Sequence, residues 1–299
     1  MGSQERTSAW RRTLAAMLAL AALTLVACGG EAGGGQSAPQ EEAANAAAEI
    51  DVPEGLLKPG TLTVGTDFTN PPYSYIEGTE RKGVDVEITA ALAETLGLEP
   101  TAVDARFASL IPGLGANRFD AIVSDLYMNP ERAKQVDYIP YFKTGTAFLV
   151  REGDYQPQQP EDLCGHSVAI LQGSLVEQLS LGEIRDACRA RGEDLTVKSF
   201  PSDPEAYNEV VAGRADVHFA DRAFAVMRAG EGELTMSSRD ILYPVAVGIA
   251  VRKGDSEMRE AIEQGIAELR RSGQLEEILG SYGLDEPDEA TIQASLEAS

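Results

Sequence analysis

The sequence predicts an α/β fold that consists of two similar halves. Segments typical of short buried strands alternate with amphipathic helices, which indicates a mainly parallel sheet with helices on both faces. The alternation stops in a loop rich in Gly, Pro and Gln that ends near Asp162, and then starts again. In addition, the motif R-x-D-x-x-x-x-D between Arg118 and Asp125 recurs between Arg214 and Asp221. We therefore expect two doubly wound lobes.

The first half begins with a buried strand over Thr61–Thr66. A helix follows in which apolar side chains recur every four residues, at Ile88, Leu92 and Leu96. Gly97 is expected to end this helix, because glycine accepts the left-handed conformation found there. The other elements predicted for this half are a strand near 102–107, a helix near 109–117 and a strand over 120–124.

The second half repeats this order. The elements predicted for it are a strand over 167–171, a helix over about 175–190, a strand over 195–200, a helix that begins at 203–204 and a strand over 216–219. The chain then returns through residues 244–251 to a helical tail with one apolar stripe, formed by Met258, Ile262, Ile266 and Leu269. We expect this stripe to lie in the core and not to face a membrane.

The N-terminus is typical of a targeting signal. Arg11 and Arg12 precede an uncharged apolar run over 14–27, which is shorter than the ~20 residues that a spanning helix needs. The run ends in Leu25–Cys28 (LVAC), which resembles the lipobox of bacterial lipoproteins, so we predict cleavage before Cys28 and its lipidation. The alternatives are an ordinary signal peptide with an incidental cysteine, and a twin-arginine signal.

A tether is expected to follow the signal peptide of residues 1–27. Residues 28–50 are mostly Gly, Ala, Gln and Glu, with almost no large apolar side chain. Such a segment cannot bury a core and is predicted to be disordered. The expected location is therefore the extracellular face of the cell membrane, with a globular body held there by a lipid anchor.

The composition limits the possible partners. The 299 residues include 48 Asp and Glu against 25 Lys and Arg, a formal net charge of −23, which opposes binding to nucleic acid. The hydrophobic share of 43% suits a buried core and excludes collagen-like, coiled-coil and largely disordered classes. Because the chain has only two histidines and three cysteines, we expect no metal and no cofactor.

Two cysteines remain once Cys28 is lipidated. The spacing of Cys164 and Cys188 matches neither a zinc site nor a C-x-x-C redox motif. Since an exported chain folds under oxidising conditions, we predict a structural disulfide between them, which would stabilise the fold by about 3.5 kcal/mol in the chain-entropy model. Two buried thiols are the alternative.

Acidic residues follow predicted strands at three places. Asp67, Asp125 and Asp221 each stand at or directly after a carboxyl end, where open α/β sheets bind ligands. One such residue is usually a turn or helix-cap residue, but three in two similar halves favour a shared cleft. A small ligand is then the expected partner.

Two helix starts are predicted near the same edge. Asn129-Pro130 has a capping residue followed by a proline, and Ser174 with Glu177 forms a capping box. Free N–H groups at such starts favour a carboxylate, and Arg132 adds a planar fork that matches one. The alternative is two ordinary capped helices with Arg132 in solvent.

Several short motifs occur along the chain in an order that is typical of one protein family. The motifs are Gly60–Asp67 (GTLTVGTD), Pro71–Tyr73 (PPY), Gly83–Glu87 (GVDVE), Leu110–Pro112 (LIP), Phe119–Ala121 (FDA), Pro130–Ala133 (PERA), Leu171–Gly173 (LQG), Gly213–Asp216 (GRAD) and Asp221. Over residues 56–284 the chain resembles family 3 extracellular solute-binding proteins, the receptors of polar amino-acid ABC importers.

The resemblance implies a fold like that of type II periplasmic binding proteins, in which two α/β lobes joined by two hinge strands close on the ligand like a clamshell. Lobe 1 would comprise residues 51–144 and 246–286, and lobe 2 residues 145–245. Residues 287–299 would be a short acidic tail.

The family's binding residues can be transferred position by position. Arg132 would hold the ligand α-carboxylate and Asp221 the α-ammonium, while Phe107 would stack on the ligand and Asp67 would meet its polar or cationic side chain. The cleft walls would be completed by Ser124 and Tyr127 on lobe 1 and by Gly173 and Ser174 on lobe 2. The departures from the family pattern are Asn129 for Thr, Asn70 for an aromatic residue, Asp125 for Gly or Ser, and Leu175 for Thr.

The resemblance implies a monomeric, lipid-anchored receptor that delivers its ligand to an ABC permease. The ligand would be a polar, in particular a basic, amino acid or a related small zwitterion, because Asp67, Asp125 and Asp221 outnumber the single positive charge of Arg132. Alternatively, Asp125 points away from the cleft or is satisfied by Lys143. A ligand-sensing module and a dehydratase-type enzyme on the same fold are the alternative functions, although no catalytic motif is visible.

Overall fold

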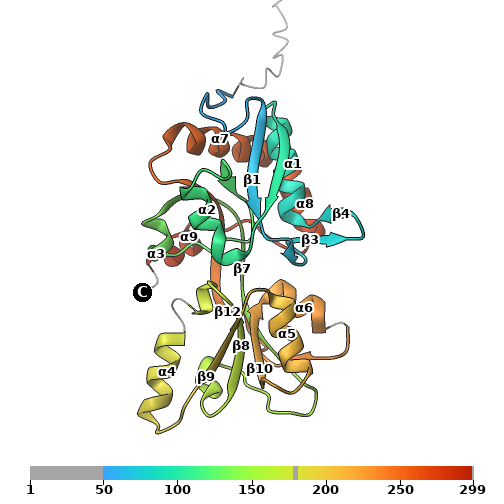
Figure 1. Ribbon diagram of the computed structural model, residues 1–299, viewed down its shortest axis with the longest axis vertical. Coiled ribbons are helices and arrows are strands. Elements are labelled where there is room, and N and C mark those ends of the chain that lie inside the picture. Colours follow the sequence, from blue (N-terminus) through green and yellow to red (C-terminus); the bar gives the residue numbers. More distant parts are fainter. Residues whose placement is uncertain (1–49, 178–180, 230, 298–299) are drawn as a thin grey trace, which may run out of the picture. The chain divides into compact units, whose positions relative to one another are not determined.

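The computed structural model describes residues 50–177, 181–229 and 231–297 (Figure 1). The predicted signal peptide, the lipidation of Cys28 and the predicted tether, except its last residue Ile50, lie outside these residues. So do residues 178–180 of the helix predicted over about 175–190. Residues on both sides of this gap are helical, and those after it form α4, Leu181–Ala190.

The first half forms a parallel arrangement around β1. Strand β1 (Thr61–Thr66) has the predicted bounds and pairs in parallel with β5 (Glu99–Asp104) and β6 (Ala121–Ile122). The other elements of this half are β2 (Thr69–Asn70), β3 (Ser74–Glu77) and β4 (Glu80–Lys82), which form a small antiparallel sheet, and α1 (Val84–Thr95), α2 (Leu110–Gly115) and α3 (Pro130–Ala133). We call these elements, together with α7 (Ser256–Ser272) and α8 (Gln274–Ser281), lobe 1.

The second half repeats the parallel pairing. Strand β8 (Ser167–Leu171) pairs in parallel with β9 (Thr196–Phe200) and β10 (Val217–Asp221). The other elements here are α4, α5 (Asp203–Val211), α6 (Arg222–Ala229) and β11 (Thr235–Met236). We call this set lobe 2. Within it Cys164 and Cys188 form a disulfide, as the sequence predicts.

Two long antiparallel strands join the lobes. They are β7 (Val136–Val150) and β12 (Leu242–Arg252), which pair with each other (Figure 1). At one end β12 pairs with β6 of lobe 1, and at the other end β7 pairs with β10 of lobe 2. They are therefore the two hinge strands of a two-lobed type II fold, which confirms the predicted fold class. The residue boundaries of the lobes stay predictions.

Two elements differ from their predicted bounds for a visible reason. The strand expected near 102–107 ends at Asp104, because Phe107 starts a single turn of 3-10 helix and donates its N–H to the Asp67 carboxylate. The strand expected over 120–124 is short, because the chain leaves the sheet before Asp125, whose φ of 45° lies in the left-handed region.

The apolar stripe of the helical tail packs in the core, as predicted. It lies on α7 (Ser256–Ser272), where Met258, Ile262, Ile266 and Leu269 are at most 2% exposed and belong to one cluster with the apolar face of α1. Helix α8 (Gln274–Ser281) follows and adds Leu275 and Leu279 to the same core. Among the helices of the described residues, none has the length and apolarity needed to cross a membrane.

The C-terminal segment is more ordered than the expected acidic tail. Residues Glu289–Glu297 form α9, which packs against β12. The Ser295 hydroxyl accepts the N–H of Ala246 on this hinge strand at 2.9 Å. Beside it, the N–H of Lys143 on β7 donates to the carbonyl of Asp285 at 2.9 Å. The end of the chain therefore contacts both hinge strands.

Candidate ligand-binding cleft

A cavity with about 400 Å³ of empty space is lined by both lobes and by a hinge strand. The residues that line it from lobe 1 are Asn70, Phe107, Asp125 and Tyr127. The hinge strand β7 contributes Thr146. The residues from lobe 2 are Leu171, Ser174, Leu175, Val176, Asp203, Phe219, Ala220 and Asp221. Six sequence-predicted site residues are therefore brought together here: Asn70, Phe107, Asp125, Tyr127, Ser174 and Asp221.

Both carboxylate oxygens of Asp221 accept hydrogen bonds. It ends β10, and its Oδ1 accepts the N–H groups of Ala223 (2.7 Å) and Phe224 (3.2 Å) at the start of α6. Its Oδ2 accepts the hydroxyls of Tyr127 and of Thr144, the latter at 3.2 Å. Burial raises the pKa of Asp221 to about 6, because desolvation penalises the charged form more than these donors favour it.

Asp125 lines the cavity, and one of its carboxylate oxygens is buried without a hydrogen-bond partner among the described residues. Its Oδ2 accepts the side-chain N–H of Asn70 at 3.2 Å. Its Oδ1 and the Oδ1 of Asn70 have no hydrogen-bond partner among the described residues, although the side chains are only 4% and 6% exposed. Desolvation and the nearby charge of Asp221 raise the pKa of Asp125 well above its usual value. Lys143 does not satisfy it, since the Lys143 ammonium pairs with Asp288 at 3.2 Å.

A third carboxylate in the cavity, Asp203, is absent from the sequence prediction. It is the first residue of α5, and its Oδ1 lies 2.9 Å from Nε2 of the fully buried His218. The sequence shows only a helix start at this position. The rule applied to Asp67 and Asp221, that a carboxylate just beyond a strand can face a ligand, would also have found Asp203, which follows β9.

Arg132 lies beside the cavity and is already engaged. The capping contact of α3 is present as predicted, since Oδ1 of Asn129 accepts the Arg132 N–H at 2.8 Å. The guanidinium donates to the carbonyls of Tyr127 and Gly173, each at 2.8 Å, and stands 5.4 Å from the ring centroid of Phe107. Arg132 and Gly173 line a neighbouring recess and are not among the described residues that line the cavity. That Arg132 holds a ligand carboxylate stays a prediction.

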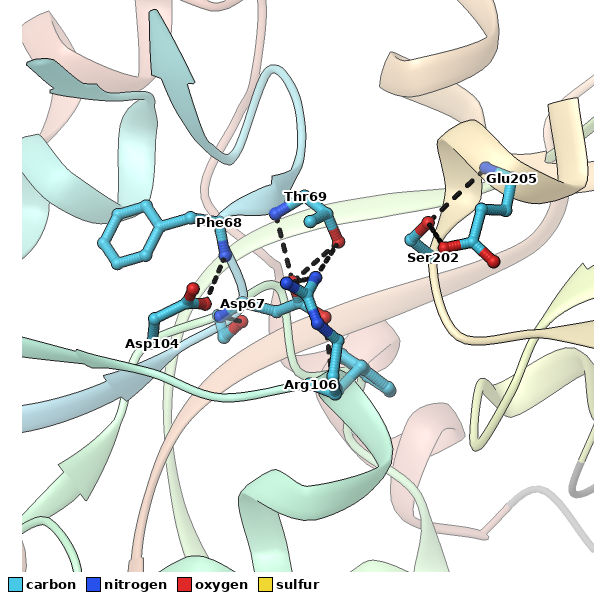
Figure 2. A network of polar contacts seen from close by, with 9 residues as sticks. Asp67, Phe68, Thr69, Asp104, Arg106, Ser202 and Glu205 are labelled. Atoms are coloured by element: carbon cyan, nitrogen blue, oxygen red, sulfur yellow. Dashed lines mark hydrogen bonds and ion pairs between the residues drawn. The ribbon is translucent and has the colours of Figure 1, made fainter. Parts of the chain in front are cut away.

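Asp67 is also fully engaged, in the network of Figure 2. Its Oδ2 accepts the N–H of Phe107 at 2.8 Å, and its Oδ1 accepts the hydroxyl of Thr69 at 2.7 Å and the guanidinium of Arg106 at 3.1 Å. Ser124 supports the same turn by accepting the Asp67 N–H at 3.0 Å. Neither Asp67 nor Ser124 is among the described residues that line the cavity. In this structure Asp67 positions Phe107, and Arg106 offsets its charge.

The carboxylates that line the cavity are therefore not the same three that the sequence predicts. The carboxylates that line the cavity belong to Asp125, Asp203 and Asp221. None of the described lining residues is a lysine or an arginine. No group of three or more His, Cys, Asp or Glu side chains in the described parts of the chain is arranged to hold a metal ion.

Comparisons with known proteins agree with this geometry. The model of the family "Bacterial extracellular solute-binding proteins, family 3" matches residues 62–285. The chain is 31% identical over 231 residues to the L-arginine-binding protein of Pseudomonas aeruginosa, covering 74% of this chain and 87% of that protein. It is 28% identical over 232 residues to the L-cystine-binding protein TcyJ of Escherichia coli, covering 75% and 84%.

Solved structures show the same architecture. An ancestral arginine-binding protein bound to arginine is 30% identical, with a TM-score of 0.69 over 75% of this chain and 98% of that one. The ancestral amino acid-binding protein AncCDT-1, a precursor of cyclohexadienyl dehydratase, is 28% identical, with a TM-score of 0.67 over 75% and 95%. The chain belongs to family 3 of the bacterial extracellular solute-binding proteins.

Proposed function

We propose that this protein is the receptor of an ABC importer and captures a small, polar, positively charged molecule of the basic amino-acid type. The observation that supports this proposal is the composition of the cavity lining. Asp125 from lobe 1 and Asp203 and Asp221 from lobe 2 line the same cavity. None of the described lining residues is a lysine or an arginine. Asp203 is already hydrogen-bonded to His218, so Asp125 and Asp221 are the lining carboxylates that have no basic partner among the described residues. Burying such carboxylates without a counter-charge costs several kcal/mol per ion, and a bound cation relieves that cost. Relatives named for arginine and histidine binding are consistent with it.

Capture would occur by closure of the lobes about the hinge strands. The two strands pair with each other between the lobe 1 end, where β12 also pairs with β6, and the lobe 2 end, where β7 also pairs with β10. Bending of both strands between these ends would move one lobe against the other. The pairing register of β7 and β12 shifts between Leu242 and Val245, beside Tyr243 with its φ of 48°. Such an irregularity weakens the ladder locally and makes this stretch the natural place for the bend.

Presentation to the permease would depend on a lipid anchor. The lipobox at Leu25–Cys28 and the Gly- and Ala-rich segment after it support an extracellular, membrane-tethered location. A tethered receptor stays near the permease at high effective concentration after it has bound its ligand. We propose that a monomer is the delivering species.

Binding without turnover is the second part of the proposal. The likeness to an ancestral precursor of a dehydratase makes an enzyme the relevant alternative. Among the residues that the structure describes, the histidine nearest the cavity, His218, is fully buried behind Asp203. Mass spectrometry of an incubated ligand decides between the two, because a binding protein returns it unchanged and an enzyme converts it.

A thermal-shift panel tests the ligand class. A ligand present at about 100 times its dissociation constant adds about 2.7 kcal/mol to the free energy of unfolding. We expect basic compounds to raise the melting temperature of the mature protein, with glutamate, leucine and glutamine as controls. Stabilisation by glutamate or leucine without any effect of basic compounds would show the proposed ligand class to be wrong.

A further inference from the structure

Asp203 lines the cavity from the start of α5, and one of its carboxylate oxygens is open to a ligand. Its Oδ1 lies 2.9 Å from Nε2 of His218. Its Oδ2 has no hydrogen-bond donor among the described residues, yet it is not one of the buried side-chain atoms that lack a partner. This oxygen therefore has accessible surface. Because Asp203 lines the cavity and is otherwise buried, a molecule in the cavity is what can reach that surface.

The other two lining carboxylates are less open. Both oxygens of Asp221 already accept hydrogen bonds. Of the oxygens of Asp125, one accepts the side-chain N–H of Asn70 and the other is buried. The pKa of Asp125 is raised by burial first and then by nearby carboxylates, of which Asp203 in the opposite lobe is one. A cation next to Asp203 would offset this repulsion as well.

His218 holds Asp203 in place without neutralising it. The imidazole is fully buried on β10, and its ring packs edge-on against Phe224, with the centroids 5.5 Å apart. Its Nδ1 has no partner among the described residues. A doubly protonated ring would leave a buried N–H unpaired there, which is rare in proteins, so we assign the neutral tautomer with its proton on Nε2. In that form the ring donates one hydrogen bond to Asp203 and brings no positive charge.

Asp203 stands where lobe 2 meets lobe 1. Helix α5, of which it is the first residue, packs against β2 of lobe 1. Asn70 of β2 lines the same cavity and donates its side-chain N–H to Asp125. A cation bound at Asp203 therefore lies at the junction of the lobes, and the first turn of α5 favours the negative charge that it meets there.

We infer that Asp203, held by His218, is a specificity-determining residue that binds the positively charged side chain of the ligand. Arg132 and Asp221 remain the expected partners of the α-carboxylate and the α-ammonium, and Asp203 selects among amino acids by the charge of their side chains. His218 is a positioning residue, because it contacts Asp203 and is not among the described residues that line the cavity. The inference rests on the proposed function and assigns its preference for basic ligands to one residue pair.

Matched ligand pairs measure this preference on the mature protein. The pairs are arginine with citrulline, and lysine with 6-hydroxynorleucine, in which a neutral group of similar shape replaces the side-chain cation. We expect isothermal titration calorimetry of the wild type to give a dissociation constant at least about tenfold lower for the basic member of a pair that binds. If the wild type binds no basic member, or binds the neutral members as tightly, the proposed ligand class and the inference both fail.

The variant Asp203→Asn tests the assignment. It keeps the shape of the side chain and an oxygen for the His218 N–H, so we expect the fold to persist. The affinity for the basic ligand should fall by about tenfold or more, and that for its neutral partner should stay within about threefold. Glu205→Gln is the matched control, because Glu205 is an exposed carboxylate in the same helix turn and does not line the cavity. If Asp203→Asn keeps the wild-type preference, the inference is overturned and the proposed function stands.

Two variants of His218 test its positioning role. His218→Gln retains an N–H donor near the place of Nε2, whereas His218→Phe retains an aromatic ring beside Phe224 and removes the donor. We expect His218→Phe to lose most of the preference for the basic ligand and His218→Gln to keep it within about threefold. An equal effect of the two variants on this preference would show that His218 contributes only packing. The Asp203→Asn measurement is independent of whether these two variants fold.

Discussion

The hydroxyl of Tyr127 in lobe 1 donates a hydrogen bond to Oδ2 of Asp221 in lobe 2, across the cavity that both residues line. The same hydroxyl contacts the carbonyl of Gly145 on the hinge strand β7 at 2.9 Å. One tyrosine therefore links a lobe, a hinge strand and the carboxylate of the opposite lobe. Burial in this network raises the pKa of Asp221 to about 6.

The stability of the ligand-free protein should fall as the pH rises from about 5 to about 8. The pKa of Asp221 is raised to about 6 and that of Asp85, buried against Tyr141 and Ser74, to about 7, both from 3.8. Between 3.8 and those values the folded state binds more protons than the unfolded state, so raising the pH through this range favours unfolding. Thermal unfolding at several pH values measures the trend.

The variant Asp221→Asn provides the control for this pH dependence. It removes one of the buried carboxyls whose pKa is raised, so the slope of melting temperature against pH should become shallower. Carboxyls with lowered pKa, such as Asp288 at about 2, are ionised throughout the range and do not contribute. A melting temperature of the ligand-free protein that rises between about pH 5 and pH 7 would contradict the assignment.

Replacement of Arg132 should weaken most strongly the binding of ligands that carry a carboxylate, because its guanidinium has N–H donors beyond the two bonds to the carbonyls of Tyr127 and Gly173. In Arg132→Ala these carbonyls also lose a buried donor, which costs about 1–3 kcal/mol for each group left unpaired. We expect a lower melting temperature, and a larger loss of affinity for arginine than for agmatine, which lacks the carboxylate. An equal fold-change for the two ligands would show that Arg132 does not hold the ligand carboxylate.

The disulfide should contribute measurably to stability. Joining Cys164 to Cys188, which are 24 residues apart, restricts the unfolded chain, and the chain-entropy model gives about 3.5 kcal/mol. The double variant Cys164→Ser/Cys188→Ser should unfold at a lower denaturant concentration than the wild type. Reductant should lower the midpoint of the wild type and leave that of the double variant unchanged. Alkylation of both thiols in the native exported protein would contradict the bond.

Helix α9 should stabilise the hinge region. Ser295→Ala removes the acceptor of the Ala246 N–H on β12 and leaves that buried group unpaired, which costs about 1–3 kcal/mol. Urea unfolding measures the loss. Ser281→Ala is a suitable control, because the Ser281 hydroxyl is exposed and contacts only the last turn of its own helix. Equal stability of the two variants would show that α9 contributes little.

Lipidation at Cys28 can be tested by fractionation. Cys28→Ser removes the thiol that would receive the diacylglycerol, so we expect the protein to leave the membrane fraction or to remain unprocessed. Stable anchoring takes more than one acyl chain, as the mature lipoprotein would have. Ser37→Ala in the same segment is the control, and membrane retention of Cys28→Ser equal to that of the control would refute the anchor.

The sequence alone determined the features that depend on local pattern. Strands β1 and β8 have the predicted bounds, because short apolar runs flanked by turn residues leave little choice of register. The capping of α3 by Asn129 and the buried stripe of α7 likewise depend on residues within one or two turns of each other. An ordered set of such local motifs was also enough to indicate the family before any contact was known.

Only the tertiary structure decided which charged side chains line the cavity. Asp67 and Arg132 have the residue types of a binding site, but partners distant in the chain, Arg106 for the first and the Gly173 carbonyl for the second, engage them. Asp203 lines the cavity from the start of α5, and its position after β9 is a local signal that an ordinary helix start explains equally well. A buried charge is governed by whichever groups lie within a few ångströms of it, and that is a property of the packed chain.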